Sequence, residues 1–160
     1  MADLAAYTTR INATNFALAN DDGSGGDYAH ADVVLVGVSR TSKTPTCLYL
    51  ANRGIKAANV PFVPGVALPA ELLAAKHPLI VGLTNDPERL IQLRRHRLEV
   101  LHHAYPGGYT DIDAVRAEVR EARRVFAERH WPVIDVTRRS IEETAASIMK
   151  LLARKHGLDG

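Results

Sequence analysis

Apolar residues follow two different periods along this chain. Residues 33–36 and 79–83 are short, nearly continuous apolar runs, which are typical of strands buried in a parallel sheet. Residues 133–136 predict another strand. Residues 57–63 are also extended, but the prolines within and after this segment predict that it pairs only weakly.

Between these runs, apolar residues recur every three or four positions, as they do on one face of a helix. Helices are predicted at residues 4–18, 45–54 and 70–75, from 86 onward, at 112–129 and at 140–154. The first of these places Leu4, Tyr7, Ile11 and Leu18 roughly on one face. The last opens with a capping box, in which Ser140 and Glu143 satisfy each other's backbone donors.

The alternation of strands and helices predicts an α/β fold, a parallel sheet with flanking helices of the P-loop kinase-like type. We expect residues 1–160 to form a single nucleotide-binding domain. Residues 1–30 would supply an N-terminal helix and an acidic, glycine-rich loop, and residues 31–160 the α/β core. Ligands are expected at the carboxyl ends of the strands.

A strand, a glycine, four variable residues and Ser-Lys-Thr follow one another at residues 33–44. This is the phosphate-binding loop pattern with Ser42 in place of its second glycine. Gly37 would let the chain turn off the strand, and the backbone N–H groups after it would form a concave nest for an anion. Lys43 would reach a β- or γ-phosphate, and the Thr44 hydroxyl would ligate Mg²⁺. The predicted nucleotide-binding residues are Gly37, Val38, Ser39, Arg40, Thr41, Ser42, Lys43 and Thr44.

The alternative is an ordinary strand-to-helix turn whose polar residues happen to match the pattern. The surroundings favour the loop, because a strand precedes it and an amphipathic helix follows. Pro45 suits the first turn of that helix, where its missing N–H costs no hydrogen bond. A positive φ at Ser42 would cost about 1 kcal/mol, which is tolerable, and its hydroxyl would add a phosphate donor.

Adjacent carboxylates at Asp21 and Asp22 are candidates for magnesium binding or for accepting a proton from a substrate hydroxyl. The alternative is an Asp-Gly turn. A P-loop enzyme usually carries an aspartate at the end of a neighbouring strand, but residues 79–83 end in Thr84, which favours the two aspartates. Asp135, at the end of the last strand, could support the site or merely lead into the following helix.

Arg89, Arg94 and Arg97 could form a lid that clamps phosphoryl oxygens. The alternative, which the sequence favours, is a solvated basic face of a helix. His102 and His103 are interpreted as surface histidines, since no cysteine or serine forms a catalytic arrangement with them.

Composition narrows the class of protein. Among 160 residues, 46% are apolar, which is enough for a proper core. The single cysteine, Cys47, excludes an internal disulfide and a cysteine-based metal site, and predicts a small buried residue in a reducing, cytoplasmic compartment. No signal or membrane-spanning segment is expected. A net charge of +2 gives little support to nucleic-acid binding.

Four separated blocks of the sequence resemble one family and follow one another in the same order as in that family. They are residues 10–23, 36–54, 82–90 and 131–145, and residues 36–54 contain the loop. The chain resembles the regulatory proteins of pyruvate, phosphate dikinase and of phosphoenolpyruvate synthase. The resemblance covers nearly the whole chain, but only about the C-terminal half of the family's protein. Ser42 in place of glycine looks like the dikinase-regulating branch.

The resemblance implies a bifunctional activity. Such proteins use ADP to phosphorylate a threonine of the dikinase, and they remove that phosphate with inorganic phosphate, forming pyrophosphate. It implies that residues 37–44 bind the nucleotide, with Mg²⁺ expected at Thr44. Lys43 is the leading catalytic candidate, with Asp22 and Asp21 as weaker ones drawn from position.

Three alternatives remain open at this stage. The chain could be a non-catalytic module that binds nucleotide or phosphate, a regulator of phosphoenolpyruvate synthase, or a generic small-molecule kinase of the P-loop type. The oligomeric state is also open, a homo-oligomer among the alternatives.

Overall fold

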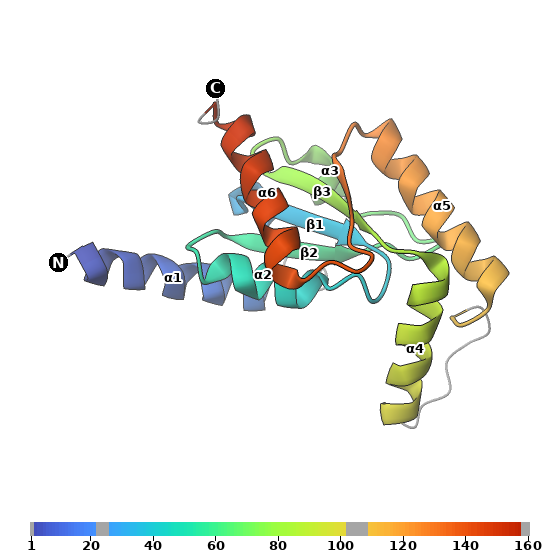
Figure 1. Ribbon diagram of the computed structural model, residues 1–160. Coiled ribbons are helices and arrows are strands. Elements are labelled where there is room, and N and C mark those ends of the chain that lie inside the picture. Colours follow the sequence, from blue (N-terminus) through green and yellow to red (C-terminus); the bar gives the residue numbers. More distant parts are fainter. Residues whose placement is uncertain (1, 22–25, 102–108, 158–160) are drawn as a thin grey trace.

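Four parallel strands form one central sheet between two layers of helices in the computed structural model, which describes residues 2–21, 26–101 and 109–157 (Figure 1). The strands are β1 (Val33–Gly37), β2 (Ala57–Pro61), β3 (Leu79–Thr84) and β4 (Val133–Asp135). They lie in the order β2-β1-β3-β4, and every pair is parallel. The predicted α/β class is confirmed.

Helices cover both faces of the sheet. Among the described residues they are α1 (Ala2–Ala19), the short 3₁₀ helix η2 (Tyr28–His30), α2 (Lys43–Ala51), α3 (Ala70–Ala74), α4 (Pro87–Leu101), α5 (Ile112–Glu128) and α6 (Ile141–Lys155). Helices α1, α2 and α6 pack on one face, and η2, α3, α4 and α5 pack on the other. No helix in the described part of the chain is long and apolar enough to cross a membrane.

Strand β1 is the centre of the molecule, and all five of its residues are buried. Successive side chains on a strand point to opposite faces. Val33 and Leu35 therefore pack with α1, α2 and α6, while Val34 and Val36 pack with the helices of the other layer. Strands buried on both faces have continuous apolar sequences, which explains why this run was recognisable.

The expectation of weak pairing at residues 57–63 was wrong, because β2 pairs with β1 over five residues. Phe62 donates its N–H to the Gly37 carbonyl at 2.8 Å, so alternate residues of this strand face β1. Pro61 occupies a position between them, where an N–H would point away from β1. Proline is tolerated on an edge strand at such a position because no ladder bond is lost.

Helix α1 has the predicted position but presents a different side to the sheet. Its buried residues are the small Ala13 and Ala17. Small side chains let the helix backbone approach the sheet closely, and this contact decides which way the helix faces. The four apolar residues predicted to share a face are exposed to 43–68%: Leu4, Tyr7, Ile11 and Leu18. The N-terminal part of α1 extends beyond the sheet (Figure 1).

The start of α6 confirms the predicted capping box. The Glu143 N–H donates to the Ser140 hydroxyl at 3.1 Å, and the Ser140 N–H donates to the Glu143 carboxylate at 3.2 Å. These hydrogen bonds lower the pKa of Glu143.

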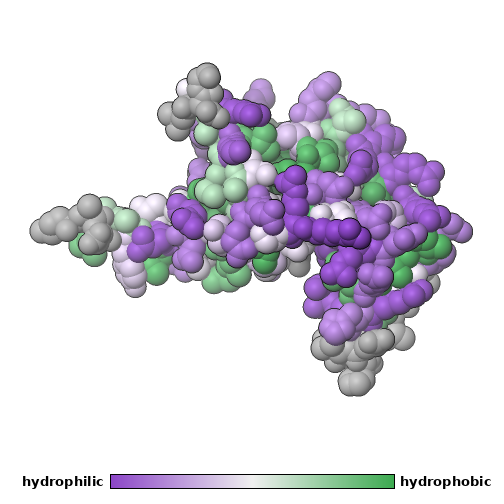
Figure 2. Space-filling view, viewed as in Figure 1, coloured by the Kyte–Doolittle hydropathy of each residue, from purple (hydrophilic) through white to green (hydrophobic). Residues whose placement is uncertain are grey.

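Cys47 is buried on α2, also as predicted. Figure 2 shows that the outward surface of α4 is mostly hydrophilic.

Candidate phosphate-binding site

The loop at residues 38–42 lies at the carboxyl end of β1. From β1 the chain continues to β2 on one side, and it later crosses to β3 on the other side. In open α/β sheets this reversal of strand order leaves a crevice outside the carboxyl ends of the strands, where ligands bind. The topology therefore places the predicted loop where such folds bind ligands.

Gly37 is required by close packing rather than by an unusual φ angle. A Cβ atom at this position would lie 2.8 Å from the Leu83 carbonyl oxygen of the neighbouring strand and 2.8 Å from the Thr41 hydroxyl. Real Cβ atoms do not approach other atoms this closely, and a backbone carbonyl in a sheet cannot move aside. The first position of the pattern accepts only glycine because the loop folds tightly back over the end of β1.

Two residues of the loop have left-handed backbone conformations, Arg40 with φ 72° and Ser42 with φ 63°. Ser42, whose positive φ the sequence left as a condition of the loop, is the residue that precedes α2. Left-handed residues interspersed among ordinary ones turn successive N–H groups toward one concave side, which is the geometry of an anion-binding nest. Its N–H groups lie next to the positive end of the α2 dipole.

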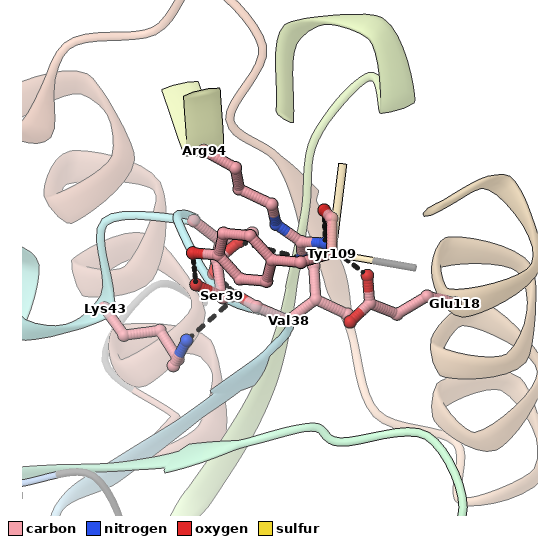
Figure 3. A network of polar contacts seen from close by, with 7 residues as sticks. Val38, Ser39, Lys43, Arg94, Tyr109 and Glu118 are labelled. Carbon is pink, nitrogen blue, oxygen red and sulfur yellow. Dashed lines mark hydrogen bonds and ion pairs between the residues drawn. The ribbon is translucent and has the colours of Figure 1, made fainter. Parts of the chain in front are cut away.

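The Lys43 side chain is folded back over this loop rather than extended into solvent. It is only 6% exposed, and its ammonium donates to the Val38 carbonyl at 3.0 Å (Figure 3). The Thr41 hydroxyl donates to the same carbonyl at 2.9 Å. The positive Lys43 side chain is thus held within the curve of the backbone that the sequence assigns to phosphate.

Thr44 and Asp21 are brought together, although they are 23 positions apart in the chain. The Thr44 hydroxyl donates to Asp21 Oδ1 at 2.7 Å, and the Asn59 side-chain amide donates to the same oxygen at 2.7 Å. Asp21 follows α1, and Asn59 lies on β2 beside the loop. Asp22, the other predicted acidic residue, lies outside the described residues.

The basic helix α4 does not behave as one solvated face. Arg94 is 1% exposed, so neither the predicted lid nor a solvated surface describes it. Its guanidinium pairs with the Glu118 carboxylate at 2.7 Å and donates to the Ser39 carbonyl at 3.3 Å (Figure 3). It also donates to the Tyr109 carbonyl at 3.1 Å and lies 4.8 Å from the centre of the Tyr109 ring.

Tyr109 completes this network from the segment before α5. Its hydroxyl shares a hydrogen bond of 3.1 Å with the Ser39 hydroxyl, so Ser39 is held through both its side chain and its carbonyl. Neither Tyr109 nor Glu118 was predicted from the sequence. The sequence does contain an indication for Glu118, because this charged residue lies between Val115 and Val119 on the side of α5 that faces the core. A charged residue at such a position calls for a buried partner.

A cleft of about 680 Å³ opens over the loop. A volume of this size is within the range of small-molecule binding sites. The loop forms one wall of the cleft, and Leu93 and Arg97 of α4 form the other. Arg89, which was considered for the lid, does not line the cleft and donates a hydrogen bond to Gln92 on the exposed surface. The lining residues are Asp21, Ser39, Arg40, Thr41, Ser42, Lys43, Thr44, Pro45, Pro61, Leu93 and Arg97.

Strands β3 and β4 end at Thr84 and at the sequence candidate Asp135. Thr84 ends β3 and is buried, and its hydroxyl accepts a hydrogen bond from Arg123 at 3.4 Å. Asp135 accepts from the Thr137 N–H at 2.9 Å and lies 3.9 Å from Arg123, so it shapes the entry to α6. Neither residue lines the cleft. His102 and His103 lie outside the described residues.

The chain is similar to proteins of a known family. Residues 2–149 match the model of a protein family described as kinase/pyrophosphorylase. The chain belongs to this family. The match includes the loop, Asp21 and all four strands, so the family relationship covers the whole site described above.

Curated relatives of the kinase/pyrophosphorylase family are closely similar to this chain. A protein of Caulobacter vibrioides is 58% identical over 152 residues, which cover 94% of this chain and 48% of the relative. A protein of Maricaulis maris is 53% identical, covering 95% of this chain and 54% of the relative. Both carry the name "Putative pyruvate, phosphate dikinase regulatory protein". This chain thus spans about half the length of the curated relatives it matches.

The buried Arg94–Glu118 pair yields a prediction about stability. Glu118→Gln should lower the free energy of unfolding by about 3–5 kcal/mol, because it leaves the buried guanidinium without a counter-charge. The measurement is urea unfolding followed by circular dichroism.

The matched control is the exposed pair of Glu88 and Arg116, 3.6 Å apart, which also joins α4 to α5. Glu88→Gln should cost less than about 1 kcal/mol, because solvent screens exposed pairs. Equal losses for the two variants would show that Arg94 does not depend on its carboxylate.

Proposed function

We propose that this chain is the nucleotide-binding, phosphate-transferring part of a regulator of pyruvate, phosphate dikinase. The observation that carries the proposal is the arrangement of Lys43, Thr44 and Asp21 around a loop at the carboxyl end of β1. Phosphoryl transfer depends mainly on positioned positive charge and orientation, and this site supplies both.

In the kinase direction, the loop N–H groups and Lys43 would hold the β-phosphate of ADP. The hydroxyl of a threonine on the target protein attacks that phosphorus, the bond between the β-phosphorus and its bridging oxygen breaks, and AMP leaves. The hydroxyl proton needs an acceptor. Asp21 and the adjacent Asp22 are the candidates, Asp21 because it lines the cleft and Asp22 from its place in the sequence.

In the phosphorylase direction, the same loop would hold inorganic phosphate. An oxygen of that phosphate attacks the phosphorus of phosphothreonine, the bond to the threonine oxygen breaks, and pyrophosphate forms. The proton of the attacking phosphate passes to the threonine oxygen. One anion-binding loop therefore serves both directions, in keeping with a family described as kinase/pyrophosphorylase.

The donor set beside the loop fits magnesium. Mg²⁺ prefers oxygen ligands and usually takes only one or two from the protein, with phosphates and waters completing the shell. Thr44 and Asp21 would hold it, since their oxygens lie 2.7 Å apart. A hydroxyl that donates to a carboxylate still offers its lone pairs. When bound, the ion would neutralise charge on the phosphate oxygens.

The dikinase is proposed as the target protein because the relatives are named as dikinase regulators. The chain spans about half of their length, so recognition of the dikinase and turnover by this chain are part of the proposal, and the transfer assay below tests them. The second candidate is a module that binds nucleotide without transferring phosphate. The same geometry favours it equally, because nothing in the loop requires the transfer step.

Asp21→Asn tests the magnesium assignment. Asparagine can still accept from Thr44 and Asn59, but it removes the negative charge that attracts a cation. ADP affinity without Mg²⁺ should therefore be nearly unchanged, and the gain in affinity caused by Mg²⁺ should fall about tenfold or more. Isothermal calorimetry with and without Mg²⁺ measures both. A full gain in the variant would exclude Asp21 as a ligand.

A transfer assay with Lys43→Ala as its control tests the activity. The chain is incubated with ADP and with pyruvate, phosphate dikinase bearing phosphohistidine, and phosphothreonine is measured. We expect phosphothreonine with the parent chain, and neither phosphothreonine nor ADP binding with Lys43→Ala. The variant Lys76→Ala, which changes an exposed lysine outside the cleft, should match the parent.

Two other results of this assay would change the interpretation of the site. ADP binding without phosphothreonine would favour the binding module. ADP binding by Lys43→Ala equal to that of the parent would overturn the assignment of the loop.

A further inference from the structure

Two arginines face the cleft from opposite walls, and the phosphate-binding loop alone does not explain them. Arg40 stands at the tip of the loop, and Arg97 projects from α4. Both are exposed, and neither has a hydrogen-bond or ion-pair partner among the residues that the structure describes. In contrast, the other two cations nearby are already held in place, Lys43 by Val38 and Arg94 by Glu118.

The conformation of Arg40 makes it the more informative of the two. Its φ of 72° lies in the left-handed region, where glycine and asparagine are much better suited than arginine. Residues held in such conformations concentrate at ligand-binding and catalytic sites. Glycine would form this turn more easily, so the arginine places a guanidinium at the cleft at a cost in backbone strain.

The charges lining the cleft indicate what these side chains would bind. The lining contains three cations, Arg40, Lys43 and Arg97, against one carboxylate, Asp21. The nest of N–H groups, together with Lys43, matches a single phosphate. The two guanidinium groups extend the positive surface beyond the nest, and planar guanidinium groups bind phosphate oxygens with two parallel hydrogen bonds.

We propose that Arg40 and Arg97 form a second phosphate subsite next to the loop, so that the cleft accepts two linked phosphates. This rests on the proposed function, in which the loop holds the first phosphate. In the kinase direction the second subsite holds the α-phosphate of ADP, next to the β-phosphate that the loop holds. In the phosphorylase direction it holds the phosphothreonine phosphate, which becomes the second phosphate of pyrophosphate.

Helix α4 is positioned for this role by the buried network below it. Arg94 lies one turn before Arg97, and it donates to the Ser39 carbonyl, next to Arg40. The same side chain thereby fixes both walls of the cleft relative to each other. The spacing between the two arginines is set by a contact inside the protein.

The test compares the binding of phosphate and of pyrophosphate by calorimetry at constant ionic strength. The variants are Arg40→Gly and Arg97→Gln. Each has a matched control: Arg138→Gly changes another exposed arginine with a positive φ of 57°, and Arg95→Gln changes another exposed arginine of α4. Neither control residue lines the cleft.

Arg40→Gly and Arg97→Gln should each weaken pyrophosphate binding about tenfold, the size expected for loss of charge-assisted hydrogen bonds. Phosphate binding should change less than about threefold, since the loop still holds one phosphate. Both controls should bind pyrophosphate like the parent. The thermal midpoint of Arg40→Gly should stay within about 2 °C, because relief of strain offsets the added flexibility of glycine.

Three results would overturn the proposal, and they differ in meaning. If all variants bind pyrophosphate like the parent, the subsite is wrong while the loop assignment stands. If the controls lose affinity as much as the test variants, only general positive charge is involved. If the parent chain binds neither phosphate nor pyrophosphate, the proposed function fails and the subsite with it.

Discussion

The loop depends on how its own carbonyl groups are satisfied. A backbone that turns its N–H groups toward a ligand must turn carbonyls the other way, and buried carbonyls need donors. Here those donors are the ends of long cationic side chains. Lys43 donates to the Val38 carbonyl and Arg94 donates to the Ser39 carbonyl. Two positive side chains therefore satisfy carbonyls of this concave loop, and one of them, Lys43, also lines the cleft.

This arrangement extends the site well beyond the loop. Burying a guanidinium is costly unless it is paired and hydrogen-bonded, and Glu118 of α5 supplies the charge that Arg94 requires. Tyr109 adds a carbonyl, an aromatic face and a hydroxyl. Helices α4 and α5 and the segment before α5 are thereby linked to Ser39. Changes far from the cleft in sequence are expected to affect phosphate binding through this link.

At the start of α2, the Thr44 hydroxyl donates to the Asp21 carboxylate. Asn59 of β2 fixes the carboxylate from the neighbouring strand. The site therefore divides into a basic half, formed by the loop and α4, and a smaller oxygen-rich half suited to a hard cation. A phosphate with bound Mg²⁺ presents complementary charges to both halves.

Local features of the site were predictable from the sequence. Strand β1, the loop, the left-handed Ser42 and the capping box at Ser140 each depend on a few consecutive residues. Contacts between distant segments were not predictable in this way. The outward face of α1 follows from Ala13 and Ala17 packing on the sheet, which outweighed the larger apolar residues.

Arg94 shows the same limit within the site itself. It stands among Arg89, Arg95 and Arg97 in a segment whose charge is typical of a solvated face. Only the fold brings Glu118 and the Ser39 carbonyl to it, from segments 24 and 55 positions away. Residues of one type on one helix therefore have three different environments: buried, exposed on the surface, and facing the cleft.

The central claim is that the loop after β1 binds phosphate through its backbone. Amide resonances in two-dimensional NMR spectra, followed during a titration with pyrophosphate, test it most directly. The largest shifts are expected at the amides of residues 38–44. Shifts confined to the polar pocket at the other end of the sheet, around Asp32, Lys56 and His77, would contradict it.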